Sequence, residues 1–167
     1  MPSLVWHFDF ISPYAYLGLH ALRRLPEGSQ IQYRPVLFAG LLNHFGQKGP
    51  AEIAPKRKWT YRSCIWLARQ NQIPFRMPAT HPFNPLGFLR LAVAAGSTPT
   101  AIEIIFRTLW ATGLNPGDPL MIEGLEIFWG SDAVDFAAAY LKNPGILDEE
   151  MLHADALPIG AFRPGAT

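Results

Sequence analysis

Residues 5–17 read Val5-Trp-His-Phe-Asp-Phe-Ile-Ser-Pro-Tyr-Ala-Tyr-Leu17. Most of the first seven are aromatic, β-branched or otherwise apolar, which predicts a buried strand. Ser12 follows at a natural N-cap position, and Pro13 occupies the first helical position, where its missing N–H costs nothing. Apolar residues then recur with helical spacing at Tyr14, Leu17, Ala21, Leu22 and Leu25. The stretch therefore predicts a strand that leads directly into a helix whose N-terminus is capped by the Ser12 hydroxyl.

The start of this helix is a candidate anion site. Unpaired backbone N–H groups and the positive end of the helix dipole meet there, and Ser12 adds a hydroxyl donor. Together these groups suit a thiolate or a carboxylate. The residues alone leave a second interpretation open, in which Ser12 only caps the helix.

The composition predicts one globular domain. The chain has 167 residues, of which 49% are hydrophobic, and this is enough for a real core. Its formal net charge is +1, and no run of Lys and Arg is longer than residues 56–58. The sequence therefore shows no basic patch of the kind that binds nucleic acid. We expect neither a signal peptide nor a membrane span, because no apolar stretch has the required pattern or length. These features predict a cytoplasmic protein without nucleic-acid or membrane partners.

The chain has a single cysteine, Cys64, within an apolar stretch that is typical of the buried face of a helix. We expect it to be a packed small hydrophobe. No Cys-x-x-Cys is present, so the residue inventory excludes intramolecular dithiol chemistry.

The remaining pattern predicts a mixed α/β protein. A second strand is expected over 30–37, short strands over 120–123 and 125–129, and helices over 38–45, 56–72, 86–95, 101–112 and 133–141. In the helix over 56–72 we expect the partly inward residues to be Trp59, Cys64, Leu67 and Ala68. The order β-α-β, helical insertion, β-β-α is that of a thioredoxin-like fold, by analogy. We expect a single domain over 1–167, with the insertion at roughly 38–118.

Several motifs occur in the type and order of one known family. They include Phe8-Asp-Phe-Ile-Ser-Pro-Tyr-Ala-Tyr-Leu17, Arg34-Pro-Val-Leu37, Ile73-Pro-Phe-Arg76, His81-Pro-Phe-Asn-Pro-Leu86, Leu109-Trp110 and Phe128-Trp-Gly-Ser-Asp132. Jointly they resemble the 2-hydroxychromene-2-carboxylate isomerases, which are glutathione-dependent relatives of the kappa-class glutathione transferases. The resemblance implies an α/β fold of the DsbA-like thioredoxin type, with its helical insertion shortened in this chain.

The resemblance also implies where glutathione binds. Ser12 matches the catalytic serine that hydrogen-bonds the glutathione sulfur, while Ser131 and Asp132 match the residues that hold the γ-glutamyl end. Physical chemistry agrees for Ser12, because a thiol with a pKa near ~8.5 is mostly protonated at neutral pH unless its anion is stabilised. We expect no metal.

The family's cis-proline is harder to place in this chain. Relatives carry several helical turns between the matches of Trp110 and Leu120, and then a turn whose cis-proline faces the thiol. Pro119 has the family spacing to Trp129 and is the candidate cis-proline, which would make it a glutathione-binding residue. In the alternative, residues 113–119 match the segment before the missing helices, and the proline-bearing turn is lost together with one wall of the cleft.

Candidate substrate-binding residues are Lys56, Asn84, Gln47 and Tyr14. Lys56 matches a family lysine near the active site, and Gln47 stands where the family typically has asparagine. Asn84 is a candidate for the cleft and Tyr14 for an aromatic pocket. Three of them have a simpler alternative: a solvated helix start for Lys56, a turn for Asn84 and core packing for Tyr14. His81 can titrate near neutrality, with a structural role as its alternative.

The resemblance implies a glutathione-dependent cis-trans isomerase that acts on an aromatic ring-cleavage product with a carboxylate or pyruvate arm. A thiolate would add to the conjugated double bond, the temporary single bond would rotate, and the thiol would be expelled. A homodimer is implied by the same relatives. Two alternatives remain open: a kappa-like glutathione transferase that conjugates electrophiles, and a thioredoxin-fold binding protein with a degenerate site.

Overall fold

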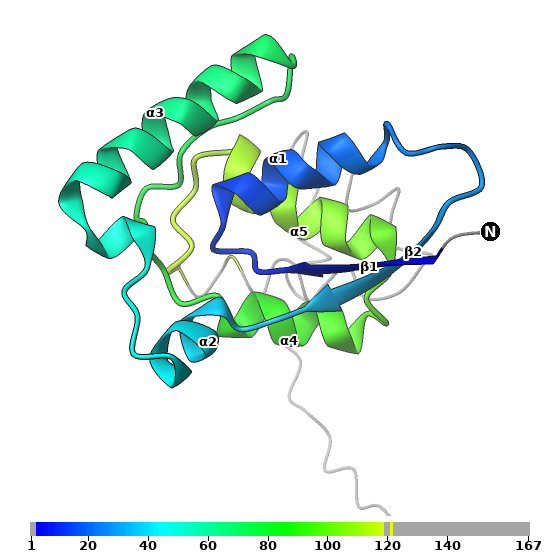
Figure 1. Ribbon diagram of the computed structural model, residues 1–167, viewed down its shortest axis with the longest axis horizontal. Helices are drawn as coiled ribbons and strands as arrows, with labels where there is room; N and C mark the ends of the chain where they lie inside the picture. The colour runs from blue at the N-terminus through cyan, green and yellow to red at the C-terminus, as the bar shows by residue number, and fades with distance from the viewer. Residues whose placement is uncertain (1–2, 119–120, 122–167) are drawn as a thin grey trace, which may run out of the picture.

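The computed structural model describes residues 3–118 and residue 121 (Figure 1). The elements in chain order are β1 (Ser3–Phe8), α1 (Pro13–Leu22), β2 (Gln30–Pro35), α2 (Phe38–His44), the 3-10 turn η1 (Pro50–Glu52), α3 (Ala54–Gln70), α4 (Leu86–Ala94) and α5 (Pro99–Ala111). The helices predicted over 38–45, 56–72, 86–95 and 101–112 are present, with their bounds within two residues of those expected. The first helix is also present, but it ends at Leu22, whereas its predicted helical spacing extends to Leu25. The strands and the helix predicted beyond residue 119 lie outside the described residues.

β1 and β2 form a parallel pair in the described part of the chain, connected through α1. The register runs from Ser3 opposite Gln30 to Phe8 opposite Pro35. Beyond the last pair, the Val36 N–H donates to the Phe8 carbonyl oxygen at 2.8 Å. A parallel pair needs a long crossover, and the amphipathic helix α1 provides it.

The prediction of a buried strand over residues 5–11 is wrong at both ends of β1. β1 ends at Phe8, and residues 9–11 form a turn before α1. Leu4 and Val5 are each 42% exposed, so the strand is buried at Phe8 but not along its whole length. Asp9 explains the early end, because its side chain accepts the N–H of Ile11 and so turns the backbone away from the strand.

The core is built around aromatic rings. The largest fully buried side chains are Trp110, Tyr16, Phe10, Phe88 and Phe106. Phe106 on α5 lies at the centre, with its ring 4.6 Å from that of Phe10 and 5.6 Å from that of Phe8. Burial of such large rings is the main stabilising contribution in a domain of this size. α5 therefore packs against the end of β1 and holds the β1–α1 junction in the core.

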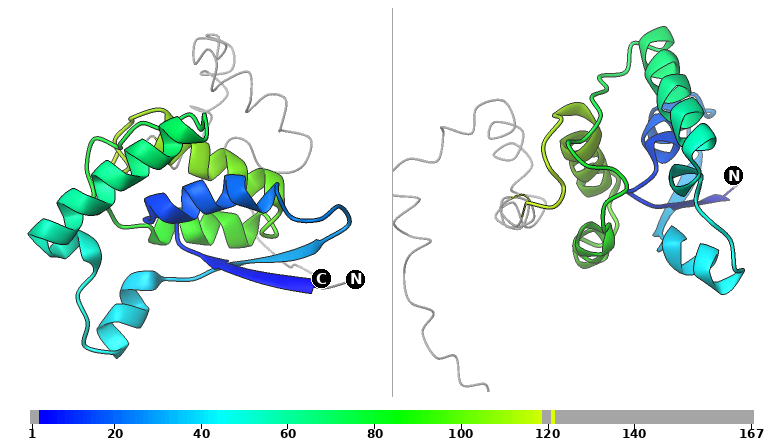
Figure 2. Two further views of the ribbon diagram at one scale, coloured as in Figure 1. Left: turned by 45° about the horizontal axis from the view of Figure 1, so that its top comes forward. Right: turned by 90° about the vertical axis from the view of Figure 1, so that its left-hand side faces the viewer.

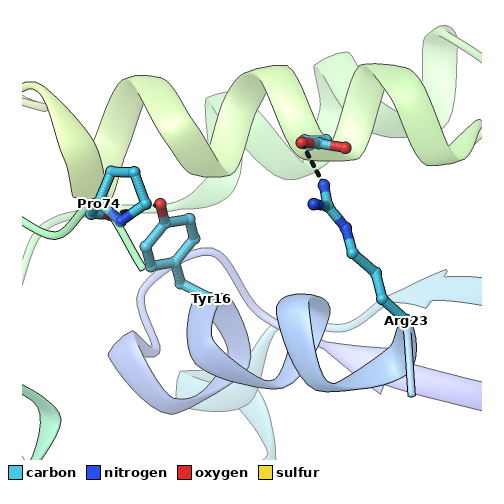
Figure 3. A network of polar contacts seen from close by, with 4 residues as sticks. Tyr16, Arg23 and Pro74 are labelled. Carbon is cyan, nitrogen blue, oxygen red and sulfur yellow. Dashed lines mark hydrogen bonds and ion pairs between the residues drawn. The ribbon is translucent and has the colours of Figure 1, made fainter. Parts of the chain in front are cut away.

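α1 is also fixed by two polar contacts (Figure 3). The Tyr16 hydroxyl donates to the Pro74 carbonyl oxygen at 2.6 Å, and Arg23 forms an ion pair with Glu103 of α5 at 2.7 Å. Burial raises the pKa of Tyr16 to about 12, so this hydroxyl remains a donor at any ordinary pH. The ion pair is largely exposed and contributes little, whereas the Tyr16 contact joins α1 to the segment that leads to α4.

α3 lies at the edge of the molecule, as both views in Figure 2 show. Cys64 and Ala68 are buried and Leu67 is half-buried, as expected, but Trp59 is 72% exposed and the inward prediction for it is wrong. Trp59 precedes Cys64 by five residues, which places it about 140° away around the helix. No helix of the described residues is both long and apolar enough to cross a membrane.

Candidate active site

Ser12 is the N-cap of α1, as the sequence predicts. Its backbone is extended, and its Oγ accepts a hydrogen bond from the Ala15 N–H at 3.2 Å. The side chain is half-buried. Within the described part of the chain, no acceptor is found for the hydrogen of the Ser12 hydroxyl or for the N–H of Tyr14. The start of α1 therefore offers a hydroxyl donor and a backbone donor to an approaching anion.

The turn before Ser12 is held from within by Asp9. The carboxylate accepts from the Ile11 N–H at 3.1 Å and from the Phe38 N–H at 2.7 Å, where α2 begins. Asp9 is 4% exposed, and this burial raises its pKa, although the backbone hydrogen bonds act in the opposite direction. The turn is thereby tied to the start of α2.

Two more side chains hold the same turn from other elements. The Trp110 Nε1–H donates to the Phe10 carbonyl oxygen at 2.9 Å, and His81 Nε2 lies 2.8 Å from the Ile11 carbonyl oxygen. Burial lowers the pKa of His81. The peptide bond between His81 and Pro82 is cis. The end of α5 and the loop before α4 thus both contact the backbone next to Ser12.

Sequence reasoning did not identify the roles of Asp9 and Trp110, and it left His81 open between a titrating and a structural group. All three lie in motifs that resemble the family. Their partners, however, are backbone atoms, and two of these partners lie 70 and 100 positions away in the chain. The residue types alone carry no signal for such contacts.

Tyr14, the residue predicted to line an aromatic substrate pocket, borders a cavity in which it is the one aromatic lining residue among those described. The cavity lies between α1 and α3 and has a volume of about 210 Å³. Its other apolar lining residues are Leu17, Ala21, Leu67 and Ile73. The Tyr14 hydroxyl is 2.6 Å from Ser63 Oγ, and the side chain is 45% exposed, so the core alternative does not apply.

The three other described substrate candidates are all exposed. Lys56 lies in the first turn of α3, and Gln47 lies in the loop after α2, where its N–H donates to the Leu42 carbonyl oxygen. Asn84 Oδ1 accepts from the Leu86 N–H at 3.0 Å, which is the contact of a turn residue before a helix. No contact recorded in residues 3–118 joins any of the three to Ser12. The remaining predicted residues, Pro119, Ser131 and Asp132, lie outside the described residues.

No metal centre is evident in the described ranges, because no group of three or more His, Cys, Asp and Glu side chains comes together there. The donors described at the start of α1 are the Ser12 hydroxyl and the Tyr14 N–H, and such donors suit an anion.

A family model described as the DSBA-like thioredoxin domain matches residues 3–146. The chain belongs to this family. A solved structure of a 2-hydroxychromene-2-carboxylate isomerase has the same fold, with a TM-score of 0.59 and 20% identity, over 90% of this chain and 78% of that one. The predicted DsbA-like thioredoxin fold is therefore confirmed.

Curated relatives carry the two names that the resemblance predicted. Glutathione S-transferase kappa 2 of Caenorhabditis elegans is 36% identical over 122 residues, which are 68% of this chain and 54% of the relative. A 2-hydroxychromene-2-carboxylate isomerase of Sphingobium xenophagum is 26% identical over 147 residues, 85% of this chain and 75% of the relative. The chain thus spans about half the length of the kappa transferase.

Proposed function

We propose that the chain is a glutathione-dependent cis-trans isomerase of the 2-hydroxychromene-2-carboxylate isomerase type. Its substrate is an aromatic ring-cleavage intermediate with a carboxylate or pyruvate arm. The observation that carries the proposal is the Ser12 hydroxyl, which caps α1 in a chain whose single cysteine is buried. A family member without a reactive cysteine needs a thiol from elsewhere.

The donor set at the start of α1 fits the thiol group of glutathione. Ser12 Oγ accepts from Ala15 and keeps its hydrogen for a second partner, and a thiolate is such an acceptor. The helix N-terminus favours negative charge at the same place. When bound, glutathione supplies the thiol nucleophile that the chain itself lacks. Ser12 is then the catalytic residue that keeps this sulfur anionic.

Cys64 is unsuited to replace that thiol. Its side chain is fully buried on α3, and burial raises its pKa to about 11, although a hydrogen bond with Tyr14 acts in the opposite direction. A thiol with this pKa is almost entirely protonated near neutral pH, and the thiolate is the reactive form.

The remaining assignments complete the proposal. Ser131, Asp132 and Pro119 bind glutathione, while Lys56, Gln47 and Asn84 bind the polar arm of the substrate. The cavity beside Tyr14 receives an apolar part of the substrate, because its lining is mostly apolar, with Arg24 and Asn71 as the polar members, and because Tyr14 lies two residues after Ser12. The chain works in the cytoplasm as a single domain with its insertion at 38–118, and it pairs as a homodimer.

The test is to measure whether glutathione is consumed or regenerated during turnover. The chain is incubated with glutathione and the cis substrate, and both the trans product and free glutathione are quantified over many turnovers. An isomerase forms the trans product while free glutathione stays constant. Consumption of one glutathione per product would instead identify a transferase.

That second candidate has support of its own, because the 36% identical relative is named a kappa-class transferase. The third candidate, a binding protein with a degenerate site, predicts no turnover. Calorimetry decides between it and both enzymes, since an enzyme of either kind must bind glutathione at millimolar concentration. Absence of heat at that concentration would exclude the isomerase as well.

A further inference from the structure

The peptide unit between Ile11 and Ser12 is held at both of its polar atoms. Its oxygen, the Ile11 carbonyl, lies 2.8 Å from His81 Nε2. Its nitrogen, the Ser12 N–H, donates to the Asp9 carbonyl oxygen at 3.1 Å. Because a peptide unit is planar, bonds at the oxygen and the nitrogen together fix the orientation of the whole unit. That orientation sets the direction in which Ser12 leaves the backbone.

The hydrogens of the His81 ring follow from its two partners. A carbonyl oxygen only accepts, so Nε2 must carry the hydrogen that is donated to Ile11. In a neutral ring Nδ1 is then an acceptor, and the Tyr61 hydroxyl lies 2.7 Å from it, closer than to the His81 carbonyl oxygen at 3.3 Å. This geometry favours donation from the Tyr61 hydroxyl to Nδ1. Tyr61 belongs to α3, so α3 determines which nitrogen of His81 faces the turn.

Ring packing keeps His81 in this orientation. Its ring lies edge-on to Trp110 at 5.4 Å and to Phe83 at 5.9 Å. Trp110 in turn donates to the Phe10 carbonyl oxygen, one residue before Ile11. The ring is therefore wedged between α3, the end of α5 and the turn, with little freedom to rotate.

We propose that His81 is a positioning residue that orients the Ser12 hydroxyl through the Ile11 carbonyl, and that Tyr61 keeps His81 in the donating tautomer. The proposal rests on the proposed function for the identity of the anion, the glutathione thiolate. His81 does not touch the thiol in this arrangement. Its effect arises because a donor that is already oriented stabilises an anion better than one that must first reorganise.

The test compares His81→Phe, which keeps a ring but removes both hydrogen bonds, with His81→Gln, whose amide can still donate to Ile11. Tyr61→Phe is the milder variant, because it removes the contacts of the Tyr61 hydroxyl with Nδ1 and the carbonyl oxygen of His81 but keeps the hydrogen bond from His81 to Ile11. His20→Phe is the control, because His20 packs edge-on to Tyr16 within α1 and makes no recorded contact with the turn. Three quantities are measured: amide hydrogen exchange at Ser12 without glutathione, the thiolate fraction of bound glutathione by ultraviolet absorbance, and turnover.

In His81→Phe we expect exchange at Ser12 to rise by about ten-fold or more, because the turn opens locally more often. The thiolate fraction at neutral pH should fall, and turnover should fall by about ten-fold, since misplacement of a catalytic group costs up to about 100-fold. His81→Gln should restore all three quantities toward the wild type. Tyr61→Phe should change them in the same direction as His81→Phe but by less, and His20→Phe should change none of them.

Unchanged exchange at Ser12 in His81→Phe would overturn the proposal, and so would an equal loss in His81→Gln and His81→Phe. If His81→Phe does not fold, unchanged values in Tyr61→Phe overturn it instead. Failure of the proposed function looks different: the wild-type chain would not bind glutathione, whereas the exchange measurement would still decide the role of His81.

Discussion

The helices α1 and α5 begin in nearly the same way. Ser12 Oγ accepts from the third residue of α1 at 3.2 Å, and Thr98 Oγ1 accepts from the third residue of α5 at 3.3 Å. Proline follows the cap in both. The surroundings differ, because Thr98 is exposed, whereas Ser12 is half-buried after a turn held by Asp9, His81 and Trp110. Capping is therefore local chemistry, and the tertiary contacts separate a cap from a candidate site.

The largest difference between the two caps should appear in catalysis. We expect Ser12→Ala to lower turnover by about 100-fold or more, as for the loss of one donor to a developing anion. Thr98→Ala should leave turnover within about two-fold, because it removes an equivalent cap bond away from the thiol. Initial rates with saturating glutathione measure both. Equal losses in the two variants would mean that Ser12 acts only as a cap.

The next largest effect should come from the tertiary contacts that only α1 has. Trp110→Phe removes the donor to the Phe10 carbonyl, which then stays buried without this partner. With the lost volume, we expect the free energy of unfolding to fall by about 2–4 kcal/mol. Trp66→Phe on α3 is the control, since Trp66 is 60% exposed and should change it by less than about 0.5 kcal/mol. Urea unfolding measures both, and similar values for the two would contradict a stabilising role for the hydrogen bond from Trp110 to the Phe10 carbonyl.

A smaller effect should be shared by the two helices. Both Ser12→Ala and Thr98→Ala remove an N-cap acceptor, so each should lower the free energy of unfolding by about 1 kcal/mol. Thermal or urea unfolding of the two variants provides the comparison. A much larger loss for Ser12→Ala would show that its hydroxyl also has a structural partner.

The smallest effect should be a dependence of stability on pH. Burial lowers the pKa of His81 and of His20 in the folded chain. The unfolded chain then binds more protons as the pH falls below ~6.5, so the folded state loses stability on acidification and has its full stability above that pH. Urea midpoints at about pH 7.5 and about pH 5.5 measure this, because these values bracket the histidine range.

His81→Gln should reduce this pH dependence, and His44→Gln is its control because His44 is exposed. The raised pKa of Asp9 acts with the opposite sign, because the folded state keeps the Asp9 proton at pH values above the ordinary pKa of 3.8. If variants of both His81 and His20 keep the wild-type change of urea midpoint with pH, the two histidines are not the source of the pH dependence.

Local pattern predicted much of the fold. The Ser12-Pro13 pair predicted the start of α1, and the helices before residue 118 follow from periodicity and proline positions. The exposure of Trp59 and the early end of β1 were not predicted. The first depends on which face of α3 meets α1. The second depends on the Asp9 carboxylate, which accepts the nearby Ile11 N–H and the distant Phe38 N–H. Neither relation has a period in the sequence.

The sequence by itself determined that a hydroxyl opens the first helix and that the single cysteine is a poor thiol donor, because caps and apolar spacing are properties of neighbouring residues. Only the tertiary structure decided that His81 and Trp110 hold the carbonyl groups before Ser12. It also decided that the Asn84 side chain accepts the Leu86 N–H and that Tyr14 borders a cavity. The physical reason is that such contacts join side chains to backbone atoms far along the chain, and packing of the aromatic core brings them together.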